Sequence, residues 1–211
     1  MRLNEIPTPA LILDRQKLKA NIDRMTGHIA SHGVKLRPHL KTCKSIDVAR
    51  IALQDNIGGI TVATLNEAEY FASFCIQDIL HGVCVTPDKL GWITELQDKN
   101  VSMTLITDSL SVARLLAEQA AGHATRLKVM VEVDCGEHRT GVLPHDPVLV
   151  EIAQCLHESD KVVFAGVFTH AGHSYQCRSL AEIKRVAEDE RTAVVSAAET
   201  LRSRGIPCDN V

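Results

Sequence analysis

The sequence has few aromatic residues, no long hydrophobic run and no marked excess of charge of one sign. Aromatic residues make up 3% of its 211 residues, whereas 45% are hydrophobic, so the core must be aliphatic. No apolar run approaches the ~20 residues of a membrane-spanning helix. The 23 basic and 26 acidic residues leave no cationic surface of the kind that binds nucleic acid. We therefore expect a globular protein with neither a membrane nor a nucleic acid as its partner.

A linker and a signal peptide are also missing. No stretch rich in proline, glycine or serine divides the chain, so we treat residues 1–211 as one domain. The N-terminal residues MRLNEIPTP lack the apolar segment of a signal peptide, which predicts a cytoplasmic protein. The seven cysteines are an odd number. In a cytoplasmic chain they are expected to be buried small hydrophobes rather than a disulfide framework.

What the sequence does contain is an alternation of short apolar runs with amphipathic stretches of helical spacing. In the first of these stretches, one helical face is formed by Leu18, Ile22, Met25 and Ile29. The expected strands are residues 10–14, 34–40, 59–63, 78–82, 102–107, 126–134, 161–170 and 207–211. The expected helices are residues 15–31, 45–54, 65–75, 87–98, 109–121, 146–158 and 179–204.

This alternation predicts a parallel sheet, because strands joined through helices return to the same edge. Two architectures fit, a doubly wound open sheet and a (β/α)₈ TIM-type barrel. The open sheet is disfavoured because no GxGxxG motif follows an early strand. The barrel is favoured because polar residues follow several strand ends, as they do at the active-site face of a barrel. A complete barrel takes about 250 residues, so we expect an α/β barrel that stops before closure.

The first polar cluster after a predicted strand is RPHLKTCK, residues 37–44. Lys41 would lie where the first barrel strand opens onto the active-site face. An aliphatic wall and neighbouring cations would lower the pKa of its amine, since both disfavour the ammonium form. A neutral lysine amine can form a Schiff base with a carbonyl compound. The simpler alternative is a solvated basic turn that binds nothing or a phosphate.

Four segments, in this order along the chain, resemble one enzyme family. They are TPALILD with RPHLKTCKS, GITVATLNEAEYF, VEVDCGEHRTGV and GVFTHAGHSY. Together they resemble the fold-type III pyridoxal-phosphate enzymes, which share the alanine racemase N-terminal barrel, in the D-serine dehydratase and D-threonine aldolase branch. The resemblance runs from about Pro9 to the C-terminus. It implies an N-terminal part of a longer enzyme, without the phosphate-binding loop and the β-rich C-terminal domain.

The resemblance also implies roles for individual residues. Lys41 would hold pyridoxal phosphate as a Schiff base and then act as a catalytic base. Arg139 would bind the phenolate side of the cofactor. His170 would lie near the cofactor ring and His39 beside it, while Tyr175 would line the substrate side as a second catalytic residue.

The activity implied is that of a pyridoxal-phosphate-dependent lyase acting on β-hydroxy D-amino acids. Loss of the β-hydroxyl group would make it a dehydratase, cleavage of the α–β bond an aldolase, and reprotonation on the other face a racemase. The sequence HAGHSY favours an ammonia-releasing, D-serine dehydratase-like enzyme. The resemblance further implies a homodimer, and a divalent zinc or manganese ion only in the full-length enzyme. Cys43 departs from the histidine that this branch often has at its position.

Other interpretations stay open. A non-catalytic pyridoxal-phosphate carrier barrel has a similar length, and a barrel without any cofactor would serve interaction alone. Glu67 and Glu69 are expected to begin a helix, where acidic groups meet the positive end of the dipole, without a catalytic role. A local zinc site is a further alternative. Its ligands would come from Cys135, His138, His170, His173 and Cys177.

Overall fold

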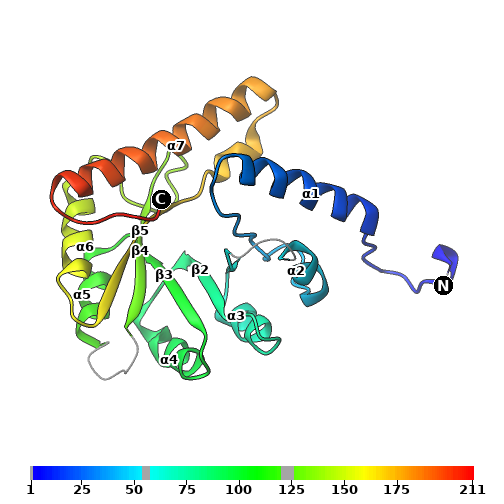
Figure 1. Ribbon diagram of the computed structural model, residues 1–211, viewed down its shortest axis with the longest axis horizontal. Coiled ribbons are helices and arrows are strands. Elements are labelled where there is room, and N and C mark those ends of the chain that lie inside the picture. Colours follow the sequence, from blue (N-terminus) through cyan, green and yellow to red (C-terminus); the bar gives the residue numbers. More distant parts are fainter. Residues whose placement is uncertain (1, 54–57, 120–125) are drawn as a thin grey trace.

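Five parallel strands form the centre of this α/β protein, as a computed structural model describes it for residues 2–53, 58–119 and 126–211 (Figure 1). The strands are β1 (Ile60–Val62), β2 (Asp78–Cys84), β3 (Ser102–Thr107), β4 (Leu127–Val133) and β5 (Val162–Thr169). Each strand pairs in parallel with the next strand along the chain, in the order β1-β2-β3-β4-β5. A doubly wound sheet reverses its strand order at a switch point, whereas a barrel does not. The strand order therefore agrees with the predicted barrel.

Helices cover the outer face of this sheet. Figure 1 shows α4, α5, α6 and α7 around the outside of the strands, and α1 extending away from them toward the N-terminus. The helices are α1 (Arg15–Ser31), α2 (Ile46–Ala52), α3 (Leu65–Ala72), α4 (Leu90–Asp98), α5 (Leu110–Gln119), α6 (Pro147–His157) and α7 (Leu180–Ser203). Side-chain caps on free backbone N–H groups explain where four of them begin. The capping residues are Asp14, Thr64, Asp146 and Ser179.

The core has two layers because side chains alternate between the faces of each strand. The outer layer lies between sheet and helices and includes Leu105 of β3, with Phe71 of α3. The inner layer is smaller and contains Leu80, Ile106 and Met130 from three neighbouring strands. Among the buried hydrophobic residues that the structure describes, Phe71 is the one aromatic residue, so the predicted aliphatic core is confirmed.

Three predicted strands are not strands in the structure. Residues 10–14 have no neighbouring strand, and Leu11 is fully exposed, so their apolar pattern alone was misleading. Residues 34–40 form only an isolated bridge, His39 with Thr61. Pro38 has no N–H to donate, and the pairing with β1 is confined to the hydrogen bonds around Thr61. The Arg37 guanidinium also donates to the Ile60 carbonyl.

The last predicted strand, residues 207–211, is also irregular, although it lies beside β5. The Val167 N–H donates to the Asn210 carbonyl at 3.1 Å, and the Asn210 side chain donates to the Ala165 carbonyl at 2.9 Å.

Most other predicted helices and strands agree with the observed bounds to within a few residues. Residues 87–98 divide into a 3₁₀ turn, Pro87–Lys89, and α4, and residues 54 and 120–121 of two predicted helices lie outside the described residues.

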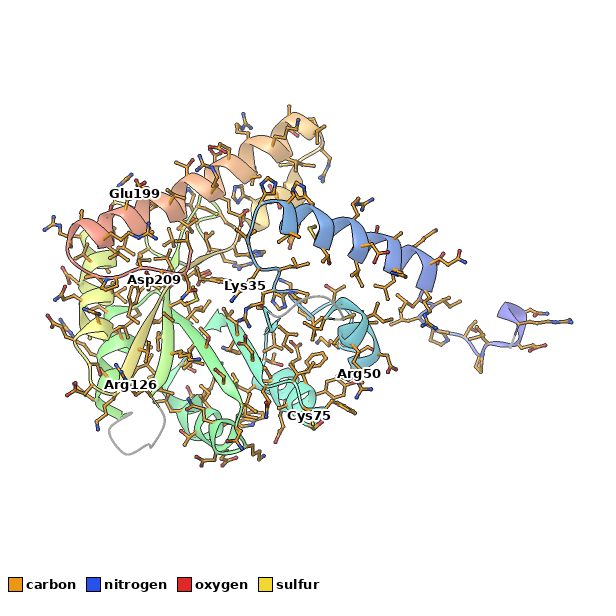
Figure 2. All side chains as sticks on the ribbon, viewed as in Figure 1. Lys35, Arg50, Cys75, Arg126, Glu199 and Asp209 are labelled. Atoms are coloured by element: carbon orange, nitrogen blue, oxygen red, sulfur yellow. The ribbon has the colours of Figure 1, made fainter. Side chains whose placement is uncertain are left out.

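The segment before β1 is attached to α3. The Ile46 N–H of α2 donates to the Tyr70 hydroxyl at 3.3 Å, and the Arg50 guanidinium lies 5.9 Å from the centre of the Phe74 ring. Arg50 and Cys75 accordingly lie close together in Figure 2. These two contacts attach α2 to α3, which packs against the sheet. They also hold the end of the short turn, residues 41–44, that precedes α2.

Two further expectations concern the cysteines and membranes. All seven cysteines are free, but only Cys135 and Cys208 are fully buried, and Cys43 and Cys75 are exposed, so the prediction of general burial was wrong. Within the described parts of the chain, every helix is too short or too polar to cross a membrane.

We predict that Leu105→Ala destabilises the fold strongly, because Leu105 is fully buried on the central strand. Loss of a buried leucine costs about 2–5 kcal/mol through lost transfer energy and the cavity left behind. Urea unfolding followed by circular dichroism measures this. The control is Leu143→Ala, since Leu143 is 52% exposed. Equal losses in the two variants would contradict the layer assignment.

Candidate functional site

A cavity of ≈ 250 Å³ opens at the carboxyl ends of the strands. Parallel strands end at one edge of a sheet, which is where barrels carry their active sites. The cavity is lined by His39, Lys41, Ala63, Gly82, Val83, Cys84, Glu132, Arg139, Thr140, Phe168 and His170. Four of the five predicted site residues, Lys41, His39, Arg139 and His170, are therefore brought together. The fifth, Tyr175, does not line this cavity.

Lys41 projects from a tight turn beside β1. The Leu40 N–H donates to the Thr61 carbonyl and the Thr61 N–H to the Pro38 carbonyl, both at 2.9 Å. The chain leaves the sheet immediately after Leu40, and the Lys44 N–H returns to the Leu40 carbonyl at 2.9 Å. Lys41 therefore follows a backbone anchored to the central sheet, and its exposed side chain reaches the cavity.

His39 lies next to Lys41 in the cavity wall. Its Nδ1 accepts a hydrogen bond from the Lys41 backbone N–H at 3.3 Å, which orients the ring. Partial burial of the ring lowers the pKa of His39, and the charge of Lys41 lowers it further, while Glu67 opposes both. A histidine with a lowered pKa is mainly neutral near pH 7. His39 therefore adds little positive charge beside the Lys41 amine.

The loop after β4 presents Arg139 to the cavity. Asp134 organises this loop from a buried position, since its carboxylate accepts the N–H groups of Gly136 at 2.8 Å and His138 at 3.1 Å. Its second oxygen lies 2.7 Å from Nδ1 of His138. Burial alone would raise the pKa of Asp134, but these hydrogen bonds outweigh it and lower the pKa. The carboxylate is thus held ionised at the base of the loop.

Gly141 closes the same loop with a left-handed backbone, φ +95°. A Cβ atom there would lie 2.6 Å from the Asp134 nitrogen, so the loop requires glycine at this position. The Gly141 N–H donates to Asp108 at the end of β3, at 2.9 Å. The next residue, Val142, pairs with Val133 in an isolated bridge. Arg139 is therefore projected from a loop that is fastened to two strands.

His170 follows β5, and a short 3₁₀ turn after it carries Tyr175. The Gly172 N–H of this turn donates to Glu137 at 3.2 Å, and Glu137 also lies 3.5 Å from the Arg139 guanidinium. The His170 and Arg139 segments are thereby linked. Tyr175 is 70% exposed, and its ring centre lies 6.1 Å from that of His170, in a neighbouring hollow.

The sequence analysis did not identify Glu132, Cys84 and Asp108 at this site. Glu132 is 4% exposed, and its carboxylate accepts hydrogen bonds from the Cys84 thiol at 3.0 Å and the Thr140 hydroxyl at 2.9 Å. Burial raises the pKa of Cys84, and the neighbouring carboxylates raise it further, so the thiol stays protonated and donates. The one signal in the sequence was a charged residue inside the apolar strand VEV.

Metal-binding geometry is limited to those three residues in the described ranges 2–53, 58–119 and 126–211. The ligand atoms of Cys84, Asp108 and Glu132 lie within 4.8 Å of one another. Their hydrogen bonds to each other and to the loop account for this proximity. The histidines and cysteines of the alternative zinc site do not form such a group among the described residues.

The sequence profile of the alanine racemase N-terminal domain matches residues 13–211. D-threo-3-hydroxyaspartate dehydratase from Delftia sp. is 38% identical over 204 residues, which are 96% of this chain and 53% of that protein. Its solved structure superposes with a TM-score of 0.92, covering 96% of this chain and 54% of that one.

Two further relatives cover almost the whole chain. D-serine dehydratase from Dictyostelium discoideum is 27% identical over 221 residues, 99% of this chain and 56% of that protein. D-threonine aldolase from Arthrobacter sp. is 30% identical over 210 residues, 99% of this chain and 55% of that protein. The chain thus spans about half the length of the curated relatives it matches.

We predict that Gly141→Ala disrupts the Arg139 loop. The added Cβ meets backbone atoms in a conformation that L side chains rarely adopt, at a cost of about 2 kcal/mol or more. Urea unfolding measures the loss of free energy. The matched control is Gly27→Ala in α1, where a Cβ meets nothing within 4 Å. If Gly141→Ala is as stable as Gly27→Ala, the backbone requirement is refuted.

We also predict a pH-dependent role for Asp134. Because its pKa is lowered in the folded state, its contribution is complete above the ordinary value of 3.8 and is lost as the pH falls through the folded pKa. Asp134→Asn should cost about 1–3 kcal/mol at pH 7, and progressively less as the pH falls below 3.8. Urea unfolding at pH 7 and at a series of pH values below 3.8 measures this, with Asp189→Asn on the exposed face of α7 as control. A pH-independent difference would contradict the assignment.

Proposed function

Because the chain belongs to the alanine racemase N-terminal domain family, we propose that it is the cofactor-binding part of a pyridoxal-phosphate-dependent lyase acting on β-hydroxy D-amino acids. One observation carries the proposal, the convergence of Lys41, His39, Arg139 and His170 on a single cavity. These residues come from the segment before β1, the loop after β4 and the end of β5. Their meeting point is the edge of the sheet where barrels carry out catalysis.

The residues around the cavity fit pyridoxal phosphate. The aldehyde of this cofactor needs an amine, its phenolate oxygen needs a fixed cation, and its flat ring needs apolar neighbours. Lys41 supplies the amine and Arg139 the cation, while Val83 and Phe168 are apolar residues in the cavity wall. When bound, this cofactor supplies the aldehyde for the lysine and an electron sink for the substrate.

The protein's own groups then divide the remaining work. Arg139 stays charged at every physiological pH, so it can hold an anionic oxygen without exchanging a proton. His39 is kept mainly neutral, and therefore does not repel a cationic substrate amine. Lys41 Nζ lines the cavity, and we assign to it the removal of a proton from the α-carbon of a substrate held there.

Among the possible reactions, we favour dehydration. The most similar of the three relatives described above is a dehydratase of a β-hydroxy D-amino acid, at 38% identity. An aldolase remains the second candidate, since 3-hydroxy-D-aspartate aldolase from Paracoccus denitrificans is 32% identical over 207 residues. Racemisation requires only a change in how the α-proton is returned. We assign no catalytic step to Tyr175, although its contact with His170 keeps it a candidate for the substrate side.

For a protein of the full length of these relatives, we propose a cytoplasmic homodimer with a divalent metal ion. The metal is supported by a solved mutant of D-threo-3-hydroxyaspartate dehydratase that is described as the metal-free form. The cytoplasmic placement is the expectation drawn from the N-terminal residues, and the dimer is implied by the sequence resemblance. None of the roles proposed above for the described residues requires the metal.

We predict that pyridoxal phosphate forms a borohydride-reducible adduct at Lys41, detected by absorbance and located by peptide mapping. Lys41→Ala should abolish it, because the substitution removes the amine that forms the Schiff base. Lys35→Ala is the matched control, since Lys35 is an exposed lysine on the same segment (Figure 2). Label on another lysine, or no label, would overturn the proposed function.

The products distinguish the candidate reactions in the same preparation. Pyruvate and ammonia from D-serine indicate dehydration, glycine and acetaldehyde from D-threonine indicate aldol cleavage, and an L-amino acid indicates racemisation. Tight binding of pyridoxal phosphate by this chain alone, without turnover of any D-amino acid, would favour a carrier.

A further inference from the structure

The turn that carries Lys41 is anchored at its end as well as at its start. At the start, Leu40 and Pro38 are hydrogen-bonded to β1 through Thr61. At the end, Lys44 has a left-handed backbone, φ 44°, which is uncommon for a residue with a side chain. Such a conformation costs about 1–3 kcal/mol and persists where surrounding contacts enforce it. The contacts of Lys44 therefore show what holds this turn.

The Lys44 side chain forms an ion pair with Glu67. Lys44 Nζ lies 3.1 Å from Glu67 Oε1, and the Glu67 side chain is only 9% exposed. The other carboxylate oxygen accepts the Ala63 N–H at 2.8 Å, at the end of β1. One buried carboxylate thus joins the end of the Lys41 turn to the end of the strand beside it.

Glu67 is itself held firmly and ionised. It lies in the first turn of α3, and its backbone N–H donates to the Thr64 side chain at 3.2 Å. Burial alone would raise the pKa of Glu67, but the Ala63 N–H and the Lys44 ammonium outweigh burial and lower the pKa. A fixed negative charge therefore faces the Lys41 turn from within the protein.

From this geometry we propose that Glu67, acting through Lys44, is a positioning residue that fixes the Lys41 turn so that the amine faces the cavity. The proposal rests on the proposed function, since it concerns the group that receives the cofactor. It gives Glu67 a role beyond the helix start expected from the sequence. Glu67 does not line the cavity. It acts on the backbone that carries Lys41, and its charge also raises the pKa of the neighbouring His39.

Glu69 shows what an ion pair without this role looks like. It lies on the same helix and pairs with Lys99 at 3.7 Å. The two lysines are equally exposed, 61% for Lys44 and 62% for Lys99. The carboxylates differ, because the Glu69 side chain is 51% exposed. Exposed pairs contribute little, so Glu69→Gln is a matched control for Glu67→Gln.

The experiment measures how fast pyridoxal phosphate forms the borohydride-reducible adduct at Lys41. Glu67→Gln keeps an oxygen for the Ala63 N–H and removes only the charge. We expect Glu67→Gln and Lys44→Met each to slow adduct formation about two- to fivefold. This range corresponds to the free energy that a single ion pair contributes. The double variant should be no slower than either single one, because both remove the same contact. Lys44→Arg should restore the rate, and Glu69→Gln should leave it unchanged.

A second measurement separates this inference from the proposed function and needs no cofactor. Amide hydrogen exchange at Lys44, whose N–H donates to the Leu40 carbonyl, should be faster in Glu67→Gln and unchanged in Glu69→Gln. Unchanged exchange at Lys44, or equal rates of adduct formation in Glu67→Gln and the wild-type protein, would overturn the positioning role. If the wild-type protein gives no adduct at Lys41, the proposed function fails, and the exchange measurement still decides whether Glu67 holds the turn.

Discussion

The parallel pairing of each strand with the next one along the chain is the constraint on which the site depends. This pairing directs the carboxyl ends of β1 to β5 to one edge of the sheet. The segments that carry Lys41, Arg139 and His170 leave the sheet at or next to this edge, and all three residues line the same cavity. No two of these three residues are close in sequence. Their meeting in one cavity therefore follows from sheet topology and not from any local motif, and a change in strand order would separate them.

The charges of the site are arranged in two layers. Buried carboxylates lie behind the loops, where Glu67, Asp134 and Glu132 accept hydrogen bonds from backbone or side chains. Exposed cations, Lys41 and Arg139, lie in front of them and line the cavity. A buried carboxylate is stable only when hydrogen-bonded or paired, so each one fixes the geometry of the loop that satisfies it. The buried carboxylates thus hold the loops that carry Lys41 and Arg139, and the two exposed cations can still bind an anionic ligand.

The sequence was sufficient for the parts of the fold with strong periodicity. Apolar runs predicted β2 to β5, and helical spacing predicted α1 with the observed bounds. Residues 34–40 were misjudged because Pro38 has no N–H to donate, and the pairing with β1 is limited to the bridge between His39 and Thr61. Four site residues followed from the resemblance, but Glu132 and the Glu67–Lys44 pair did not. Their roles depend on contacts between segments distant in sequence, which periodicity does not encode.

The central claim is that this edge of the sheet holds pyridoxal phosphate through Lys41. Crystals of the protein soaked with the cofactor test it most directly. We expect electron density continuous with Lys41 Nζ, with the Arg139 guanidinium against the phenolate oxygen and the ring in the cavity beside His39 and His170. Density joined to another lysine, or a cofactor bound away from the carboxyl ends of the strands, would contradict the account.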